Sequence, residues 1–167
     1  MKKVYFDAAA EQDCIGIIRS DAEIVPSGTT VHAMSVRDKN AEYQRYADAY
    51  DIHFIFDDDV PAVGFFTVPY IRIFAYDSRS GYLGFLWQEN GEEPVCYIDR
   101  ERKAFLAAQS VMDLWNHPAR WKEHLTPCDG VTVYPSKTDA AKELEFMAMP
   151  ETQPKFPDDF RQIHRDK

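Results

Sequence analysis

The chain has 167 residues, of which 45% are hydrophobic and 28% charged, a composition typical of one globular domain and unlike disordered or fibrous proteins. Its 28 acidic and 19 basic residues give a net charge of −9, which argues against binding to the phosphate backbone of nucleic acids and favours a basic partner. Aromatic residues reach 14%, and such side chains suit a sheet covered by helices. We therefore expect one folded domain.

The start of the chain and its cysteines indicate the cellular compartment. Asp7 and the polar run at residues 11–13 interrupt any apolar stretch before it reaches the length of a secretion signal. No window approaches the ~20 apolar residues that span a bilayer. Cys14, Cys96 and Cys128 fit neither a disulfide framework nor a CxxC metal site. We therefore expect a cytoplasmic protein with reduced thiols and no membrane contact.

The first third of the chain predicts few regular elements. Residues 14–35 mix short apolar runs with turn-forming residues and favour an irregular region with one or two short strands. Residues 38–50 contain neither glycine nor proline and place tyrosines at helical spacing, which predicts a helix. A strand at 52–56 then ends in three acids whose mutual repulsion favours an exposed turn: Asp57, Asp58 and Asp59.

The middle of the chain predicts an antiparallel meander. Runs rich in β-branched and aromatic residues at 70–76, 82–87 and 94–98 are separated by turn-forming segments, and a fourth short strand is expected at 103–106. Asn90-Gly91 is a strong signal for a tight hairpin turn, because both residue types accept a positive φ.

Helices are expected after the meander. Residues 109–116 predict one helix, and Pro118 can occupy the first turn of a second. A short strand at 131–134 precedes a helix over 137–149, for which Ser136 supplies a capping hydroxyl. The domain is therefore expected to span 1–149, and 150–167 form a charged, proline-containing tail.

No catalytic, metal or cofactor motif is present. His117 and His124 lie seven residues apart, about 10 Å along a helix, too far to converge on one ion, so surface or capping roles are favoured. The acids at 57–59 lack the EF-hand spacing that Ca²⁺ sites require. The glycines form no phosphate-binding loop. Cys96, within the strand at 94–98, is expected to be a buried core thiol.

Residues 60–125 resemble the SUKH superfamily, which includes the Smi/Knr-type yeast cell-wall regulators and many bacterial immunity proteins. The similarity rests on Phe74-Ala75-Tyr76-Asp77 with Gly81-Tyr82, on Pro94-Val95-Cys96-Tyr97-Ile98-Asp99, and on Phe105-Leu106-Ala107 leading into the helix at 110–115. The resemblance implies an α+β fold with a central, mostly antiparallel sheet flanked by helices. It also implies a protein without enzymatic activity that binds another protein, in bacteria commonly a toxin such as a nuclease.

The hypothesis from sequence is a non-enzymatic protein-binding domain, specifically an immunity protein that neutralises a toxin with a basic surface. No catalytic residue, cofactor or metal site is assigned. The alternatives are a small hydrolase or transferase using Cys96, His53 or His117, and a regulatory scaffold of cell-wall synthesis. Clustered acids in predicted loops are the candidate contacts: Asp57, Asp58, Asp59, Glu89, Glu92 and Glu93.

Overall fold

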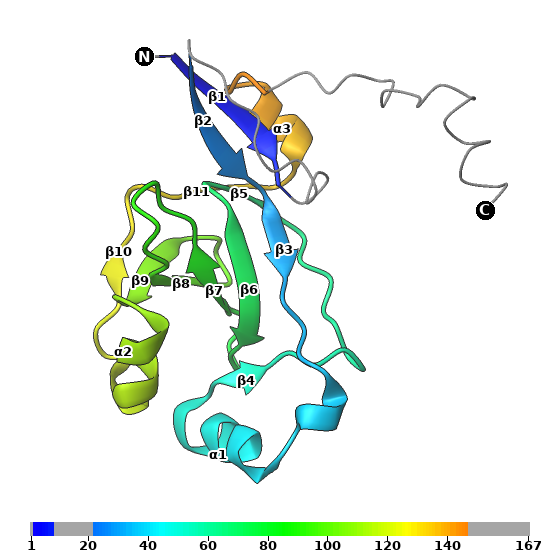
Figure 1. Ribbon diagram of the computed structural model, residues 1–167, viewed down its shortest axis with the longest axis vertical. Helices are drawn as coiled ribbons and strands as arrows, with labels where there is room; N and C mark the ends of the chain where they lie inside the picture. The colour runs from blue at the N-terminus through cyan, green and yellow to red at the C-terminus, as the bar shows by residue number, and fades with distance from the viewer. Residues whose placement is uncertain (1, 9–21, 147–167) are drawn as a thin grey trace, which may run out of the picture.

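The computed structural model describes residues 2–8 and 22–146, and its centre is a seven-stranded sheet (Figure 1). The strand order is β10-β9-β8-β7-β6-β3, and β4 also pairs with β6. The strands are β3 (Thr29–Val31), β4 (His53–Phe54), β6 (Ile71–Tyr76), β7 (Tyr82–Leu86), β8 (Val95–Ile98), β9 (Ala104–Ala108) and β10 (Thr126–Pro127).

The predicted meander is confirmed. β6, β7, β8 and β9 are consecutive antiparallel neighbours, and only β3 joins this sheet in parallel, beside β6. The chain is thus an α+β domain with a central, mostly antiparallel sheet and helices at its sides. The proposed tail at 150–167 lies outside the described residues, as does Cys14.

Two smaller sheets lie above the central sheet in Figure 1, one at the top of the picture and one between the two. β1 (Lys2–Asp7) pairs in parallel with β2 (Ala22–Ser27), and β5 (Phe66–Val68) pairs antiparallel with β11 (Thr132–Tyr134). β2 and β3 are the short strands expected in the irregular region, whereas β1 was not predicted. Its pairing depends on a partner some twenty residues along the chain, which local pattern does not reveal.

The turns of the meander show why particular residues are needed. In the β6–β7 turn Ser80 has φ 66°, and a Cβ on Gly81 would lie 2.2 Å from the Tyr97 hydroxyl, so this glycine permits close packing. In the β7–β8 connection Gly91 has φ 82°. Strand pairing ends at Phe85 and Val95, so the Asn90-Gly91 turn lies within a longer loop and does not itself join the strands.

The helices are shorter than the sequence suggests. α1 (Ala41–Tyr50) and α2 (Val111–Asn116) match predicted helices, but the turn at Pro118 is a 3₁₀ helix, η2 (Pro118–Arg120). α3 (Lys137–Ala141) begins at the expected Ser136 cap and ends well before 149. A further 3₁₀ turn, η1 (Val36–Asp38), precedes α1. None of the helices in the described part of the chain is long and apolar enough to cross a membrane.

Each face of the central sheet carries its own hydrophobic cluster, because side chains alternate along a strand. On β7 and β8, Leu83, Val95 and Tyr97 belong to the cluster that α2 covers with Leu114. Cys96 and Ile98 belong to the cluster on the opposite face. A bulge at Phe74 shifts the register of β6 and places Phe74 and Ala75 together in the cluster below α2.

Candidate protein-binding surface

Half-buried aromatic side chains surround α1 on one face of the central sheet. α1 contains no fully buried residue, although Tyr43 and Tyr46 point toward the sheet and are half-buried. Phe54 of β4 and Trp115 of α2 are half-buried beside them. A surface helix normally buries an apolar stripe against the core, so the inner side of α1 is only partly covered.

The rings meet mainly edge to face. Phe54 lies 5.2 Å from Tyr43 at 75° and 5.9 Å from Tyr46 at 86°, measured between ring centroids. Trp115 lies 5.6 Å from Tyr46 at 72° and 5.3 Å from Phe54 at 36°. Phe74 extends the network to Phe85, with which it stacks at 4.6 Å. Such contacts hold the rings in fixed orientations.

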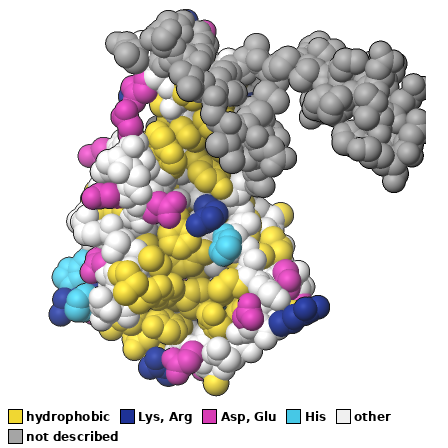
Figure 2. Space-filling view, in the orientation of Figure 1, with side chains coloured by type: hydrophobic (Ala, Val, Ile, Leu, Met, Phe, Trp, Pro, Cys, Tyr) yellow, Lys and Arg dark blue, Asp and Glu magenta, His cyan; other side chains and the backbone are white. Residues whose placement is uncertain are grey.

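These rings enclose a hollow of about 340 Å³, called here the aromatic hollow. In Figure 2 the hydrophobic side chains gather on this face, over the region where Figure 1 shows α1, α2 and β4. Met112, three residues before Trp115 on α2, is 60% exposed. The residues lining the hollow are Met34, Asn40, Glu42, Tyr43, Tyr46, Phe54 and Trp115.

The acids predicted as contacts do not form one patch. Asp57, Asp58 and Asp59 lie in the expected exposed turn, where Asp57 accepts a hydrogen bond from the Val36 N–H at 3.1 Å. Asp59 lines a cavity of about 430 Å³ with Gly81 and Tyr82, at the start of β7. The three glutamates, Glu89, Glu92 and Glu93, lie beyond the other end of β7, in the loop that leads to β8.

A polar cluster ties the end of α1 to the β6–β7 turn. Asp51, in the left-handed conformation just after α1, accepts hydrogen bonds from the Ser78 N–H at 3.0 Å and the Ser78 hydroxyl at 2.6 Å. Lys122 bonds the same carboxylate, and the His53 imidazole lies 2.8 Å from it. Partial burial raises the pKa of Asp51, but the bonds from Lys122, Ser78 and His53 outweigh it and hold that pKa well below its ordinary value.

Asp77, in the same turn, is the buried acid next to this cluster. It is 4% exposed, accepts the Tyr97 hydroxyl at 2.7 Å and the Gly81 N–H at 2.8 Å, and lies 3.9 Å from the Lys122 ammonium. Burial, and then the bond to Asp77, raise the pKa of Tyr97 above its ordinary range. The two carboxylates together hold α1, β8 and the turn after η2 in place.

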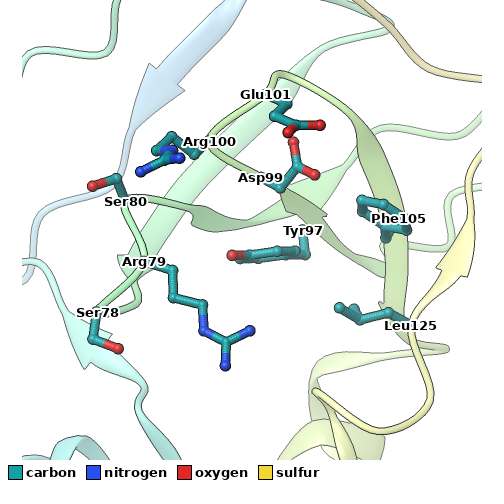
Figure 3. Close-up of a pocket in the computed structure, with 9 residues that line it drawn as sticks. All are labelled: Ser78, Arg79, Ser80, Tyr97, Asp99, Arg100, Glu101, Phe105 and Leu125. Carbon is teal, nitrogen blue, oxygen red and sulfur yellow. The ribbon is translucent and has the colours of Figure 1, made fainter.

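A larger cavity of about 580 Å³ opens beside Tyr97, between the β6–β7 and β8–β9 turns. Figure 3 shows the Arg79 side chain extending below the Tyr97 ring, with Asp99, Arg100 and Glu101 on the other side of that ring. Its rim carries charges of both signs and its floor is aromatic, so its shape does not select one class of ligand. We assign no function to it.

The histidines and Cys96 do not come together. β4, which carries His53, is separated from β8 by β6 and β7, about 14 Å at the usual strand spacing. His117 follows α2 on the face opposite Cys96 and lines a cavity of about 280 Å³ with Asp113 and His124. The described residues include no group of three or more side chains able to hold a metal ion. The site that a Cys/His hydrolase would need is therefore not formed by these three residues.

Cys96 is fully buried, as predicted, and the half-buried Cys128 packs against the same cluster, a contact that sequence spacing did not suggest. Interaction with the Cys128 thiol and burial raise the pKa of Cys96, whereas interaction with the Cys96 thiol lowers the pKa of Cys128. A thiolate, and not a thiol, is the nucleophile in alkylation.

This difference predicts selective alkylation. With iodoacetamide at pH 7.5, we expect Cys128 to react at least about tenfold faster than Cys96, because it is more exposed and more readily ionised. Mass spectrometry of proteolytic peptides measures each site separately. Both cysteines should react at the same rate in a strong denaturant. Equal rates in the folded protein would contradict the greater exposure and lower pKa of Cys128.

Comparison with protein-family models, with curated proteins and with solved structures finds no match to the chain. The assignment of the candidate surface therefore depends only on the geometry of its residues. Its most specific signal in the sequence is the spacing of Tyr43, Tyr46 and Tyr50, which marks one helical face. Phe54 and Trp115 reach that face only through the sheet, which no local pattern shows.

Proposed function

We propose that this chain is a non-enzymatic protein-binding domain of the SUKH type, and that its partner docks on the aromatic face formed by α1, β4 and α2. The observation that carries the proposal is the half-buried ring network around a helix with no fully buried residue. Tyrosine, tryptophan and methionine are enriched at the centres of protein interfaces, where their burial supplies much of the binding energy. A bound partner would cover the aromatic rings that the fold leaves half-buried.

The charge of the chain favours a basic partner. A net charge of −9 attracts a positively charged protein over a Debye length of about 10 Å and increases the rate of association at low salt. A toxin that holds nucleic acid on a basic surface has this chemistry. We therefore propose that the chain acts as an immunity protein, with Asp57, Asp58, Asp59, Glu89, Glu92 and Glu93, at the two ends of β7, contributing to long-range attraction.

The test compares two substitutions of exposed apolar side chains. The partner is isolated by cross-linking in the native organism, purified, and titrated against the wild type, Met112→Glu and Val60→Glu. Met112 is 60% exposed beside Trp115, and Val60 is 50% exposed after the acidic turn, so each change adds one charge at an accessible site. We expect Met112→Glu to weaken binding at least tenfold and Val60→Glu to change it less than twofold.

If Met112→Glu and Val60→Glu changed the affinity for the partner equally, the interface would not lie on the aromatic face. The immunity role has its own readout: the partner should arrest growth when produced alone, and co-production of the wild type, but not of Met112→Glu, should restore growth. A partner that binds at the aromatic face without arresting growth would contradict the immunity role and favour a regulatory scaffold.

Reversal of Asp58 and Asp59 to lysine should slow association at low salt. An unchanged association rate would show that these two acids do not contribute to the long-range attraction.

A further inference from the structure

The aromatic hollow has the chemistry of a cation site. Its walls are the rings of Tyr43, Tyr46, Phe54 and Trp115, and the exposed carboxylate of Glu42 stands at its edge. The face of an aromatic ring carries negative electrostatic potential, so several rings around one space favour a positive charge there. A carboxylate at the rim adds to that preference.

Cations of the chain itself already contact one ring of the hollow and one ring beside it. The Arg45 guanidinium lies 5.5 Å from the centroid of Tyr46, and the Lys39 ammonium lies 5.2 Å from that of Phe56. Arg45 also pairs with Glu42 at 2.8 Å, but their side chains are 57% and 67% exposed. An ion pair this exposed is weak and exchanges readily, so Glu42 is accessible to an incoming cation.

We propose that the aromatic hollow receives a lysine side chain of the partner, with its ammonium against the rings and near Glu42. This inference rests on the proposed function and names the group that is recognised. The ring contacts favour lysine over arginine. Phe54 meets Tyr43 and Tyr46 at 75° and 86°, and Trp115 meets Tyr46 at 72° and Phe54 at 36°, so none of these four pairs of rings is parallel. A compact ammonium can approach rings inclined to one another, whereas a flat guanidinium stacks best on parallel surfaces.

The experiment uses small probes in place of the partner. NMR spectra of the full chain are followed while Nα-acetyl-lysine methylamide, its trimethyllysine analogue, the uncharged carbon isostere of that analogue, or Nα-acetyl-arginine methylamide is added. We expect the two ammonium probes to shift the Trp115 indole signal with dissociation constants on the order of millimolar, as a single side chain without its protein allows. The trimethyllysine probe should bind at least tenfold more tightly than its uncharged isostere.

Variants locate the site and separate charge from shape. Glu42→Gln should weaken the ammonium probes several-fold, and Tyr46→Leu should remove the saturable shift. Arg45→Gln should strengthen binding, because it frees the Glu42 carboxylate. Glu123→Gln, an exposed acid after η2, is the matched control and should change nothing.

Three outcomes would overturn the assignment: no saturable shift, equal affinity for the charged and uncharged isosteres, or tighter binding of the arginine probe. These failures are distinct from failure of the proposed function. If Met112→Glu abolishes partner binding while no ammonium probe binds, the interface stands and the lysine assignment falls. If the probes bind but no partner depends on Met112, the hollow is an ammonium site and the proposed docking of a partner on this face falls.

Discussion

Replacement of Asp77 by alanine is expected to lower the free energy of unfolding by about 3–5 kcal/mol, the range for breaking a buried, charged hydrogen-bond network. The Asp77 side chain is 1% exposed and lies near Lys122. It accepts three hydrogen bonds, from the Tyr97 hydroxyl, the Gly81 N–H and the Arg79 N–H. Alanine would leave the hydroxyl of the buried Tyr97 and the N–H of the buried Gly81 without this acceptor.

Urea unfolding measures this loss, and two further variants show its origin. Asp77→Asn keeps the shape and one acceptor oxygen, so it should cost less than alanine. Tyr97→Phe should destabilise the wild type but have little further effect in the Asp77→Ala background, because the shared bond is already gone. A loss below about 1 kcal/mol for Asp77→Ala would mean that the turn rearranges and satisfies its donors in another way.

The pH dependence of the same pair has a definite sign. The pKa of Tyr97 is raised in the folded protein by burial and by Asp77, so folding favours the protonated phenol. The stability from this bond is complete below about pH 10, the ordinary pKa of tyrosine, and is lost as the pH rises through the higher folded value. Tyr97→Phe should flatten the alkaline limb of the unfolding profile.

The sequence predicted the elements whose signals are local. Alternating apolar residues with turn formers between them gave the β6–β9 meander, and the Ser136 cap marked the start of α3. The parallel pairings of β1 with β2 and of β3 with β6 were not predicted, because they join segments distant in the chain. α3 ends at Ala141, and by Phe146 the chain already pairs with Tyr5 of β1, a distant contact that local helical composition does not reveal.

The same distinction separates the predicted from the unpredicted parts of the candidate site. Tyr43 and Tyr46 were recognised as one helical face, but their contact with Trp115 spans some seventy residues. The acids were correctly placed in exposed loops, yet their division between the two ends of β7 follows from strand order. Likewise, the contact between Cys96 and Cys128 exists only because β9 and β10 bring the chain back beside β8.

Asp51 connects the stability of the fold to the geometry of the proposed binding face, because it ends α1 and holds that end against the β6–β7 turn. Its φ of 58° lies in the left-handed region, which asparagine and glycine accept more easily than alanine. Its carboxylate bonds Lys122, Ser78 and His53. Asp51→Ala loses the bonds and strains the backbone, so we expect a loss of about 2–4 kcal/mol in unfolding free energy.

The Asp51→Asn variant separates the contribution of the carboxylate charge from that of the backbone conformation. Asp51→Asn keeps the left-handed conformation but weakens the bond to Lys122, and Asp51→Gly keeps only the conformation, so the losses should increase from asparagine to glycine to alanine. The folded pKa of Asp51 is depressed, so its charge stabilises the fold fully above about pH 4 and progressively less as the pH falls toward the folded value. The difference between the wild type and Asp51→Asn should therefore be largest at neutral pH and shrink in acid.

The binding face should respond as well. Asp51→Asn weakens the bond to Lys122 and so loosens the C-terminal end of α1, which makes the orientation of Tyr43 and Tyr46 toward Phe54 and Trp115 less fixed. We therefore expect Asp51→Asn to weaken partner binding at pH 7 even where the protein remains folded. Asp48→Asn is the matched control, since Asp48 lies on the same helix and its bond to Gln44 is exposed. Equal partner affinities for the two variants would show that α1 is positioned by its aromatic contacts alone.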